Sequence, residues 1–503
     1  MSTRLRIFPD LVQNPIDPRL YGSFIEHLGR AVYTGLYEPG HPTADAQGFR
    51  RDVLDLVREL NVPMVRYPGG NFVSAYDWED GVGPRAQRPC RLDYAWGVTE
   101  TNQFGTNEFM AWCKVAGTAP MMAFNLGTRG LDAARQLVEY CNASIGTKFG
   151  DQRKAHGFAD PYNVRTWCLG NEMDGPWQTG RKTADEYGRL ANETANALRQ
   201  FDPALELIAC GSSGPAMPAF AEWERVVLEH CYGQVDALSI HLYVCEAGYK
   251  SLADYLACPV VMENQMRDVL AACDFVKAKQ RHKKTMMLSF DEWNVWDMAR
   301  FGAKCERWAE APPQLEQLYT FADALVVGGM LLALLRQSGR VRYACLAQLV
   351  NVIAPIMTAP GGGAWRQTIF HPFAQASRHG RGALLFTHLT GSTHTDTPTH
   401  GPSPDIEAVA TRDGDQVAVF ILHRGQATPA AFILEVEGST RWRVIEHQLL
   451  AAPDPHACNG PDQAETVAPR CAPTPSFAAD NTLALTLPPL SWHLLRLAPE
   501  NAT

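Results

Sequence analysis

Two glutamates are the residues most able to do chemistry, because each closes a short apolar run. Glu172 ends the run that begins at residue 164, and Glu292 ends the run that begins at residue 286. Both runs have the composition of buried strands. A pair of carboxyl groups cleaves a glycosidic bond when one acts as an acid and the other as a nucleophile or base. Aromatic rings suit the apolar faces of sugars, and those nearby are Trp177, Trp293 and Trp296.

Further polar side chains stand at the ends of other apolar runs. Such groups bind a polyhydroxylated ligand when parallel strands bring their carboxyl ends to one face. A single glutamate, histidine or tryptophan of this kind is more often structural, and the Pro-Gly-Gly stretch at 68–70 is most simply a turn. Six of eight candidate strands end in hydrogen-bonding groups, which together favour a sugar site. The polar residues concerned are Glu26, His27, Asn71, Asn171, Glu172, His241, Tyr243, Asp291, Glu292, Asn294 and Gln348.

The elements that must hold these residues alternate along the chain between residues 19 and 360. Strand-like apolar runs are separated by amphipathic helical stretches, and eight such strands are the number found in a closed (β/α)8 TIM barrel. An open doubly wound sheet normally carries a glycine-rich phosphate turn after its first strand, and residues 22–29 do not match one. The expected strands are 20–25, 62–67, 120–125, 164–170, 205–210, 235–242, 284–290 and 343–349.

The pattern changes after about residue 370. Helical periodicity gives way to short alternating runs separated by turn signals, which predict a jelly-roll-like β-sandwich. The short β-like run at 4–8 is expected to add a strand to it, since chain termini often meet. We therefore predict an N-terminal segment at 1–18, a (β/α)8 catalytic barrel at 19–370 and a C-terminal β-sandwich domain at 371–503.

Composition restricts the class of partner. The 503 residues exceed what one hydrophobic core usually holds, so two domains are expected. A formal net charge of −9 argues against nucleic acid and anionic membranes as partners. No secretion signal or bilayer-spanning stretch is evident, and 13 cysteines scattered mostly in apolar runs fit a reduced, cytoplasmic protein. No zinc-binding spacing occurs, so we expect neither a metal nor a cofactor.

Three segments resemble signature sequences of the family 51 glycoside hydrolases, the intracellular α-L-arabinofuranosidases. They are YPGGNFV at 67–73, WCLGNEMDGPWQ at 167–178 and FDEWNVW at 290–296. Further matches at 91–96, 125–130, 360–368 and 491–497 extend the resemblance over nearly the whole chain. One position departs from the family pattern: Asp297 stands where an aromatic residue is commoner, which bears on the outer subsites.

The resemblance implies a retaining, exo-acting enzyme that releases terminal arabinofuranose from arabinan or arabinoxylan oligosaccharides. It implies Glu172 as the acid/base and Glu292 as the nucleophile. It also implies a homo-oligomer, which is a hexamer in this family. The residues that match the sugar-binding positions of the family are Glu26, Asn71, Asn171, His241, Tyr243 and Gln348, with Trp96 and Trp177 at the aromatic positions.

Two other functions stay open from the sequence. Another retaining barrel glycosidase, such as a β-xylosidase or an endoglucanase, would carry the same pair of glutamates. A non-catalytic carbohydrate-binding protein would use the β-sandwich or an inactive barrel, and the presence of both glutamates argues against it. A barrel aldolase or isomerase would need a strand-end lysine or a metal cluster, and neither is evident.

Overall fold

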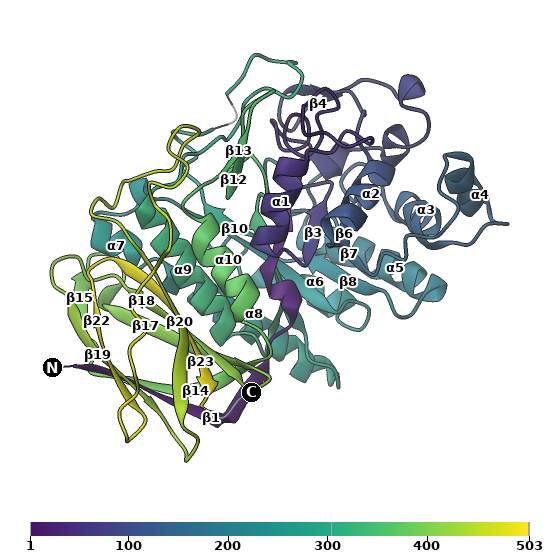
Figure 1. The fold of residues 1–503 in the computed structure, drawn as a ribbon. Coiled ribbons are helices and arrows are strands. Elements are labelled where there is room, and N and C mark those ends of the chain that lie inside the picture. The colour runs from purple at the N-terminus through teal and green to yellow at the C-terminus, as the bar shows by residue number, and fades with distance from the viewer. Residues whose placement is uncertain (1, 303, 501–503) are drawn as a thin grey trace.

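A closed barrel of parallel strands forms the larger part of the protein (Figure 1). The computed structural model describes residues 2–302 and 304–500. Eight strands close in the order β10-β11-β2-β3-β6-β7-β8-β9, which confirms the predicted (β/α)8 barrel. The strands are β2 (Gly22–Phe24), β3 (Met64–Tyr67), β6 (Ala119–Ala123), β7 (Thr166–Leu169), β8 (Glu206–Cys210), β9 (Ala237–Val244), β10 (Met287–Val295) and β11 (Val341–Ala347).

Amphipathic helices cover the outside of the barrel and alternate with its strands, as the helical periodicity predicts. The exception is α9, whose residues from Phe321 to Leu335 are buried on every side because the second domain covers its outer face. The helices are α1 (Arg51–Leu60), α2 (Thr106–Ala116), α3 (Leu131–Asn142), α4 (Lys148–Ala155), α5 (Ala184–Phe201), α6 (Glu222–Cys231), α7 (Leu252–Leu256), α8 (Pro259–Gln280), α9 (Phe321–Arg336) and α10 (Phe370–His379).

The strands β9 and β10 run further than the sequence predicts. They stay paired as far as Val244 and Val295, so Tyr243 and Glu292 lie within strands rather than after them. The apolar runs end earlier, because the last residues of both strands line a polar site instead of the core. The backbone hydrogen bonds between β9 and β10 continue past the ends of the apolar runs, and hydropathy does not reveal them.

A bulge in β10 sets the direction of the second glutamate. The register of β10 shifts against both neighbouring strands over residues 289–293. In a regular strand, two consecutive side chains point to opposite faces. Here Asp291 Oδ1 lies 3.3 Å from His241 Nε2, and Glu292 Oε2 lies 3.6 Å from His241 Nδ1. The bulge therefore turns two consecutive carboxylates toward the same histidine.

The second domain is a single curled sheet of nine strands in the order β21-β20-β23-β18-β17-β14-β1-β19-β22. Side chains from β19 and β22 at one end and from β20 and β23 near the other share one hydrophobic core. The sheet therefore folds over on itself, as expected for a sandwich-like domain. The strands are β14 (Ala383–Thr390), β17 (Ile406–Asp413), β18 (Gln416–His423), β19 (Ala430–Val436), β20 (Trp442–Ala451), β21 (Arg470–Cys471), β22 (Thr482–Leu487) and β23 (Ser491–Pro499), with β1 (Thr3–Pro15) inserted among them.

The N-terminal strand β1 lies inside this sheet and is drawn in purple among green and yellow strands in Figure 1. It pairs antiparallel with β14 and parallel with β19. The helix α10 begins at the predicted domain boundary and packs on α1 and α9 of the barrel. The exact boundaries, at 18/19 and 370/371, stay predictions.

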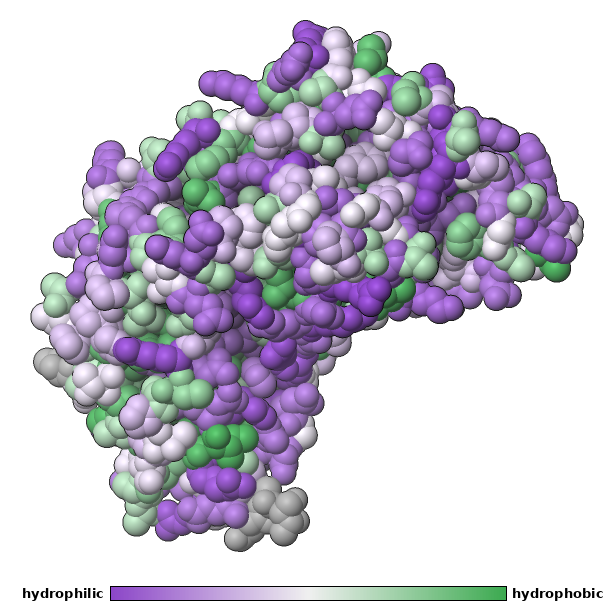
Figure 2. Space-filling view, turned by 45° about the horizontal axis from the view of Figure 1, so that its top comes forward, coloured by the Kyte–Doolittle hydropathy of each residue, from purple (hydrophilic) through white to green (hydrophobic). Residues whose placement is uncertain are grey.

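The face seen in Figure 2 is mostly hydrophilic, and its hydrophobic residues form small separate patches. Among residues 2–302 and 304–500, no helix combines the length and apolar character needed to cross a bilayer.

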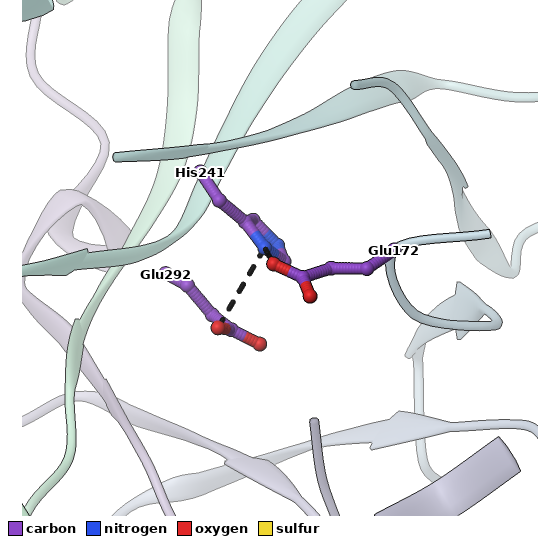
Figure 3. A group of neighbouring side chains, drawn as sticks. All are labelled: Glu172, His241 and Glu292. Atoms are coloured by element: carbon purple, nitrogen blue, oxygen red, sulfur yellow. Dashed lines mark hydrogen bonds and ion pairs between the residues drawn. The ribbon is translucent and has the colours of Figure 1, made fainter. Parts of the chain in front are cut away.

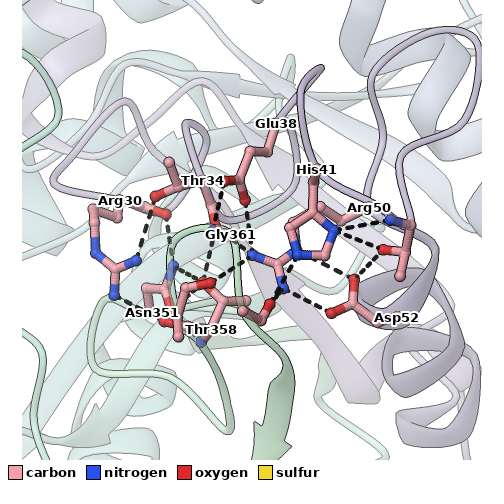
Figure 4. A network of polar contacts seen from close by, with 12 residues as sticks. Arg30, Thr34, Glu38, His41, Arg50, Asp52, Asn351, Thr358 and Gly361 are labelled. Carbon is pink, nitrogen blue, oxygen red and sulfur yellow. Dashed lines mark hydrogen bonds and ion pairs between the residues drawn. The ribbon is translucent and has the colours of Figure 1, made fainter.

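A buried ion-pair network ties the long loop before α1 to the loop between β12 (Ile356–Thr358) and β13 (Ala364–Arg366) (Figure 4). Arg50 is fully buried and donates to Glu38 Oε2 at 2.9 Å and to Asp52 Oδ2 at 2.7 Å. It also donates to three backbone carbonyls, those of Thr34, Ala359 and Gly362. One guanidinium thus joins segments that lie about 300 residues apart in sequence.

We predict that Arg50→Met lowers the free energy of unfolding by about 3 kcal/mol, because it leaves two partly buried carboxylates and three backbone carbonyls without their donor. Urea denaturation followed by circular dichroism measures the change. The matched control is Arg135→Ala on α3, whose partially exposed pairs with Asp132 and Glu139 should contribute less than about 1 kcal/mol. Equal effects of the two substitutions would contradict the role of Arg50.

Candidate active site

The two glutamates singled out from the sequence meet at the mouth of the barrel, with His241 between them (Figure 3). One carboxylate oxygen of Glu172, one of Glu292 and a ring nitrogen of His241 all lie within 4.8 Å of one another. All three side chains are buried. The separate strand ends therefore build one compact acid pair around an imidazole.

A tight turn after β7 directs Glu172 into the barrel mouth. Gly170 has φ +100° and Glu172 itself has φ +43°, in the left-handed region that side-chain-bearing residues rarely adopt. Its two oxygens contact different donors: His241 Nδ1 lies 2.8 Å from Oε1, and Trp177 Nε1 donates to Oε2 at 2.6 Å. Such local strain is typical of residues whose position serves a function.

Glu292 is held by one donor on each oxygen. Arg66 Nη1 donates to Oε1 at 2.7 Å, and the Tyr243 hydroxyl donates to Oε2 at 2.8 Å. The other guanidinium nitrogen, Arg66 Nη2, donates to Asn171 Oδ1 at 2.7 Å. Arg66 therefore fixes the second glutamate and the residue before the first one. The sequence analysis missed Arg66, although it is the one charged residue in the buried strand β3.

A second layer of charge lies beneath this pair. His241 Nε2 lies 3.2 Å from Ser239 Oγ and 3.3 Å from the buried carboxylate of Asp291. Burial alone lowers the pKa of His241, but the charge of Glu292 and hydrogen bonds to Asp291 and Glu172 outweigh it and raise the pKa to about 10. The imidazole is therefore a cation at neutral pH. Asp291 was among the polar residues expected at the strand ends, but its contact with His241 beneath the acid pair was not predicted.

A third group of side chains surrounds Glu26, which follows β2. Its Oε1 accepts from Phe72 N at 2.8 Å and from Trp96 Nε1 at 2.9 Å, and its Oε2 accepts from Gln348 Nε2 at 3.4 Å. Burial raises the pKa of Glu26 to about 8 in spite of these donors. A Cβ at Gly70 would lie 2.2 Å from Glu26 Oε2, so the Pro-Gly-Gly stretch is more than a turn: it makes room for this carboxyl group.

Comparison with known proteins places the chain in a family. Residues 56–251 match the profile described as "Alpha-L-arabinofuranosidase 1 domain", and residues 291–491 match "Alpha-L-arabinofuranosidase C-terminal domain". The chain is 50% identical over 493 residues to an intracellular exo-α-(1→5)-L-arabinofuranosidase of Halalkalibacterium halodurans, covering 96% of this chain and 97% of the relative. A family 51 α-L-arabinofuranosidase structure from Bifidobacterium longum superposes with a TM-score of 0.94 at 43% identity, covering 99% of both chains.

The chain belongs to the family 51 α-L-arabinofuranosidases. The family resemblance seen in the sequence and the prediction of a glycoside hydrolase are thereby confirmed. A related structure, an arabinose complex of the Thermotoga maritima α-L-arabinofuranosidase, has a TM-score of 0.87 at 32% identity, covering 98% of this chain and 99% of that one. At 45% identity over 502 residues the chain also resembles an exo-α-(1→6)-L-arabinofuranosidase of Bifidobacterium longum, covering 98% of this chain and 96% of the relative.

In this arabinofuranosidase the remaining predicted residues surround the acid pair to different degrees. Asn71 is half-buried at the start of the turn that carries Phe72 to Glu26, and its role stays a prediction. Trp177 is 50% exposed at the rim. Trp296 is partly buried, and its ring and the ring of Tyr243 meet edge to face with their centroids 5.3 Å apart.

Trp293 corrects an expectation drawn from the sequence. It is fully buried and packs against Phe373 of α10, so it belongs to the core and offers no face to a sugar. Trp293 follows Glu292 in a stretch of β10 that pairs regularly with β9, so its side chain points away from the site to which Glu292 points. Asp297 accepts from the backbone of Arg300 at 3.1 Å and thereby shapes the loop after β10.

We predict that the stability of the wild-type enzyme falls relative to Glu26→Gln as pH rises from about 4.5 to about 8. In this window the folded state keeps the proton on Glu26 while the unfolded chain releases it, so unfolding becomes easier by up to roughly 1.4 kcal/mol per pH unit. Glutamine resembles the protonated side chain and does not titrate. Urea unfolding of both proteins at pH 5, 6, 7 and 8 measures the difference, and parallel pH curves would contradict a raised pKa at Glu26.

Proposed function

We propose that the protein is an exo-acting α-L-arabinofuranosidase that releases terminal, non-reducing arabinofuranose with retention of configuration. The observation that carries the proposal is the distance of at most 4.8 Å between oxygens of Glu172 and Glu292. Retaining glycosidases separate their carboxyl groups by about 5–5.5 Å, whereas inverting enzymes need about 6.5–9.5 Å to admit a water molecule. The separation in this site is therefore that of a retaining enzyme, in which the second carboxylate itself attacks the sugar.

In the first step Glu292 attacks the anomeric carbon and forms a glycosyl ester, while Glu172 gives its proton to the departing glycosidic oxygen. Arg66 and Tyr243 hold the two oxygens of Glu292, which fixes the attacking group in direction. Asn171, oriented by Arg66, is placed to hold the 2-hydroxyl of the sugar, a contact that strengthens in the oxocarbenium-like transition state.

In the second step Glu172, now a carboxylate, takes a proton from water as the water attacks the anomeric carbon. The ester bond to Glu292 breaks, and arabinose leaves with its original configuration. The cationic His241 contacts Glu172 and lies near Glu292, so it balances the negative charge that moves from one glutamate to the other. Glu26, Asn71 and Gln348 are left to bind the remaining hydroxyl groups.

We propose arabinan-derived and arabinoxylan-derived oligosaccharides as substrates, with α-(1→5)-linked arabinose preferred. Several relatives at 49–51% identity are named exo-α-(1→5)-L-arabinofuranosidases, and the relative named for α-(1→6) linkages is 45% identical. Hydrolysis rates on α-(1→2), (1→3), (1→5) and (1→6) arabinobiosides rank the linkages. On nitrophenyl glycosides, xylopyranoside cleavage as fast as arabinofuranoside cleavage would favour the alternative of a β-xylosidase.

We also propose that the enzyme is cytoplasmic and assembles into a homo-oligomer. Several relatives are named intracellular, and the family resemblance implies a hexamer. Light scattering coupled to size-exclusion chromatography tests this, since a hexamer of 55.5 kDa chains is far larger than a monomer.

We predict that Glu292→Ala lowers kcat/KM by more than about 10⁴-fold, because the attacking group is lost. Azide filling the gap should attack the substrate from the opposite face and give the β-configured arabinofuranosyl azide. NMR of the product identifies the anomer. Wild-type turnover by this variant, or an α-azide product, would show that Glu292 is not the nucleophile.

We predict that Glu172→Ala slows hydrolysis of arabino-oligosaccharides by about 10²–10⁴-fold while sparing the first step for 4-nitrophenyl arabinofuranoside. The nitrophenolate leaving group needs no proton, so the glycosyl-enzyme should accumulate after a burst. Azide should then attack this intermediate and give the retained α-azide. If the two substrates lose activity equally and no α-azide forms, Glu172 is not the acid/base.

A further inference from the structure

Both oxygens of Glu172 are occupied by nitrogen donors in the free enzyme. His241 Nδ1 lies 2.8 Å from Oε1, and the indole Nε1 of Trp177 donates to Oε2 at 2.6 Å. A carboxyl group that protonates a leaving oxygen must carry its proton on one oxygen and direct it at the substrate. A protonated oxygen still has a lone pair but accepts more weakly than a carboxylate oxygen, so the contact to the oxygen that takes the proton weakens when Glu172 acts as an acid.

The contact to His241 is fixed by the barrel. Its ring is buried, its Nε2 lies between Ser239 and Asp291, and its backbone carbonyl accepts from Gln265 at 2.9 Å. Moving this imidazole would separate a buried cation from its carboxylates, which is costly.

The contact to Trp177 is free to break. Trp177 is 50% exposed, and among residues 2–302 and 304–500 the hydrogen bond to Glu172 is the only one that its indole makes. Half of the Trp177 side chain faces solvent, whereas the carboxyl group to which it donates is buried.

Gly175 makes this position of the indole possible. A Cβ at residue 175 would lie 2.7 Å from Cε2 and 2.9 Å from Nε1 of Trp177. Only the absence of a side chain there lets the ring fold back over the turn and reach Glu172. The Glu-Met-Asp-Gly-Pro-Trp stretch at 172–177 thus contains both the acid and the residue that covers it.

We infer that Trp177 is a positioning residue that caps Glu172 Oε2 in the free enzyme, gives way when the leaving group binds, and returns after it departs. The inference rests on the proposed acid/base role of Glu172. The cap opposes the first step, because a hydrogen bond donated to Oε2 is stronger with the carboxylate than with the protonated carboxyl group. It assists the second step, because it orients the carboxylate that takes a proton from water.

The test compares Trp177→Phe, which keeps a ring but removes the donor, with the wild-type enzyme on phenyl and 4-nitrophenyl arabinofuranosides. The two aglycones are similar in size and differ in their need for a proton. We expect kcat/KM for the phenyl substrate to rise relative to that for the 4-nitrophenyl substrate by roughly threefold to tenfold, the effect of removing one charge-assisted hydrogen bond at an exposed site. Breakdown of the glycosyl-enzyme, measured after the nitrophenolate burst, should slow.

A second variant moves the indole without changing it. Gly175→Ala should displace the ring and shift the phenyl to 4-nitrophenyl ratio in the same direction. Gly214→Ala, on the loop after β8 where a Cβ meets no atom within 4 Å, is the control and should leave the ratio unchanged. A purely structural or stacking role of Trp177 would slow both steps for both substrates, and that result, or an unchanged ratio, overturns the cap.

Failure of the Trp177 cap can be distinguished from failure of the acid/base role of Glu172. If Glu172→Ala gives the α-azide while both tryptophan-loop variants keep the wild-type ratio, the cap alone is wrong. If Glu172→Ala forms no α-azide, the acid/base role itself fails.

Discussion

The site depends on a balance of buried charge. Three carboxylates, those of Glu172, Asp291 and Glu292, lie within contact of two cations, Arg66 and His241. A buried carboxylate without a partner costs several kcal/mol, so the acid pair can exist only where these cations hold it. The cations in turn come from β3 and β9. In the barrel β9 is the direct neighbour of β10, whereas β11 and β2 lie between β10 and β3. Closure of the barrel is therefore a condition for the chemistry, because it brings these strands around one centre.

The architecture was predictable from the sequence because it rests on periodicity. Eight apolar runs separated by amphipathic stretches predicted the barrel. The change near residue 370 from helical periodicity to short alternating runs predicted the sheet-rich domain. The two glutamates were found because each interrupts an apolar run. Arg66 was missed because one charge inside a buried strand does not reveal its partners, which lie 105 and 226 residues away.

Other features were hidden because they depend on a local departure from regular structure. Hydropathy does not reveal the register shift in β10 before Glu292, so the sequence did not show that Asp291 and Glu292 both contact His241. Gly70 is a similar case: its neighbours predict a turn, but only the folded chain shows the Glu26 carboxyl group that excludes a Cβ. The sequence thus identifies candidate site residues, whereas local irregularities of the backbone determine which of these residues are in contact.

The position of β1 has a consequence for how the protein is made. Arg4 pairs with Thr390 and Leu5 with Leu434, so β1 has no partner until about 400 further residues have been synthesised. At about 5–20 residues per second this wait is roughly 20–80 s. During that time the apolar side chains of Leu5 and Ile7, which end fully buried, face water. The second domain is therefore complete only when β1 pairs with these later strands, and until then β1 is an open edge with which another chain can pair.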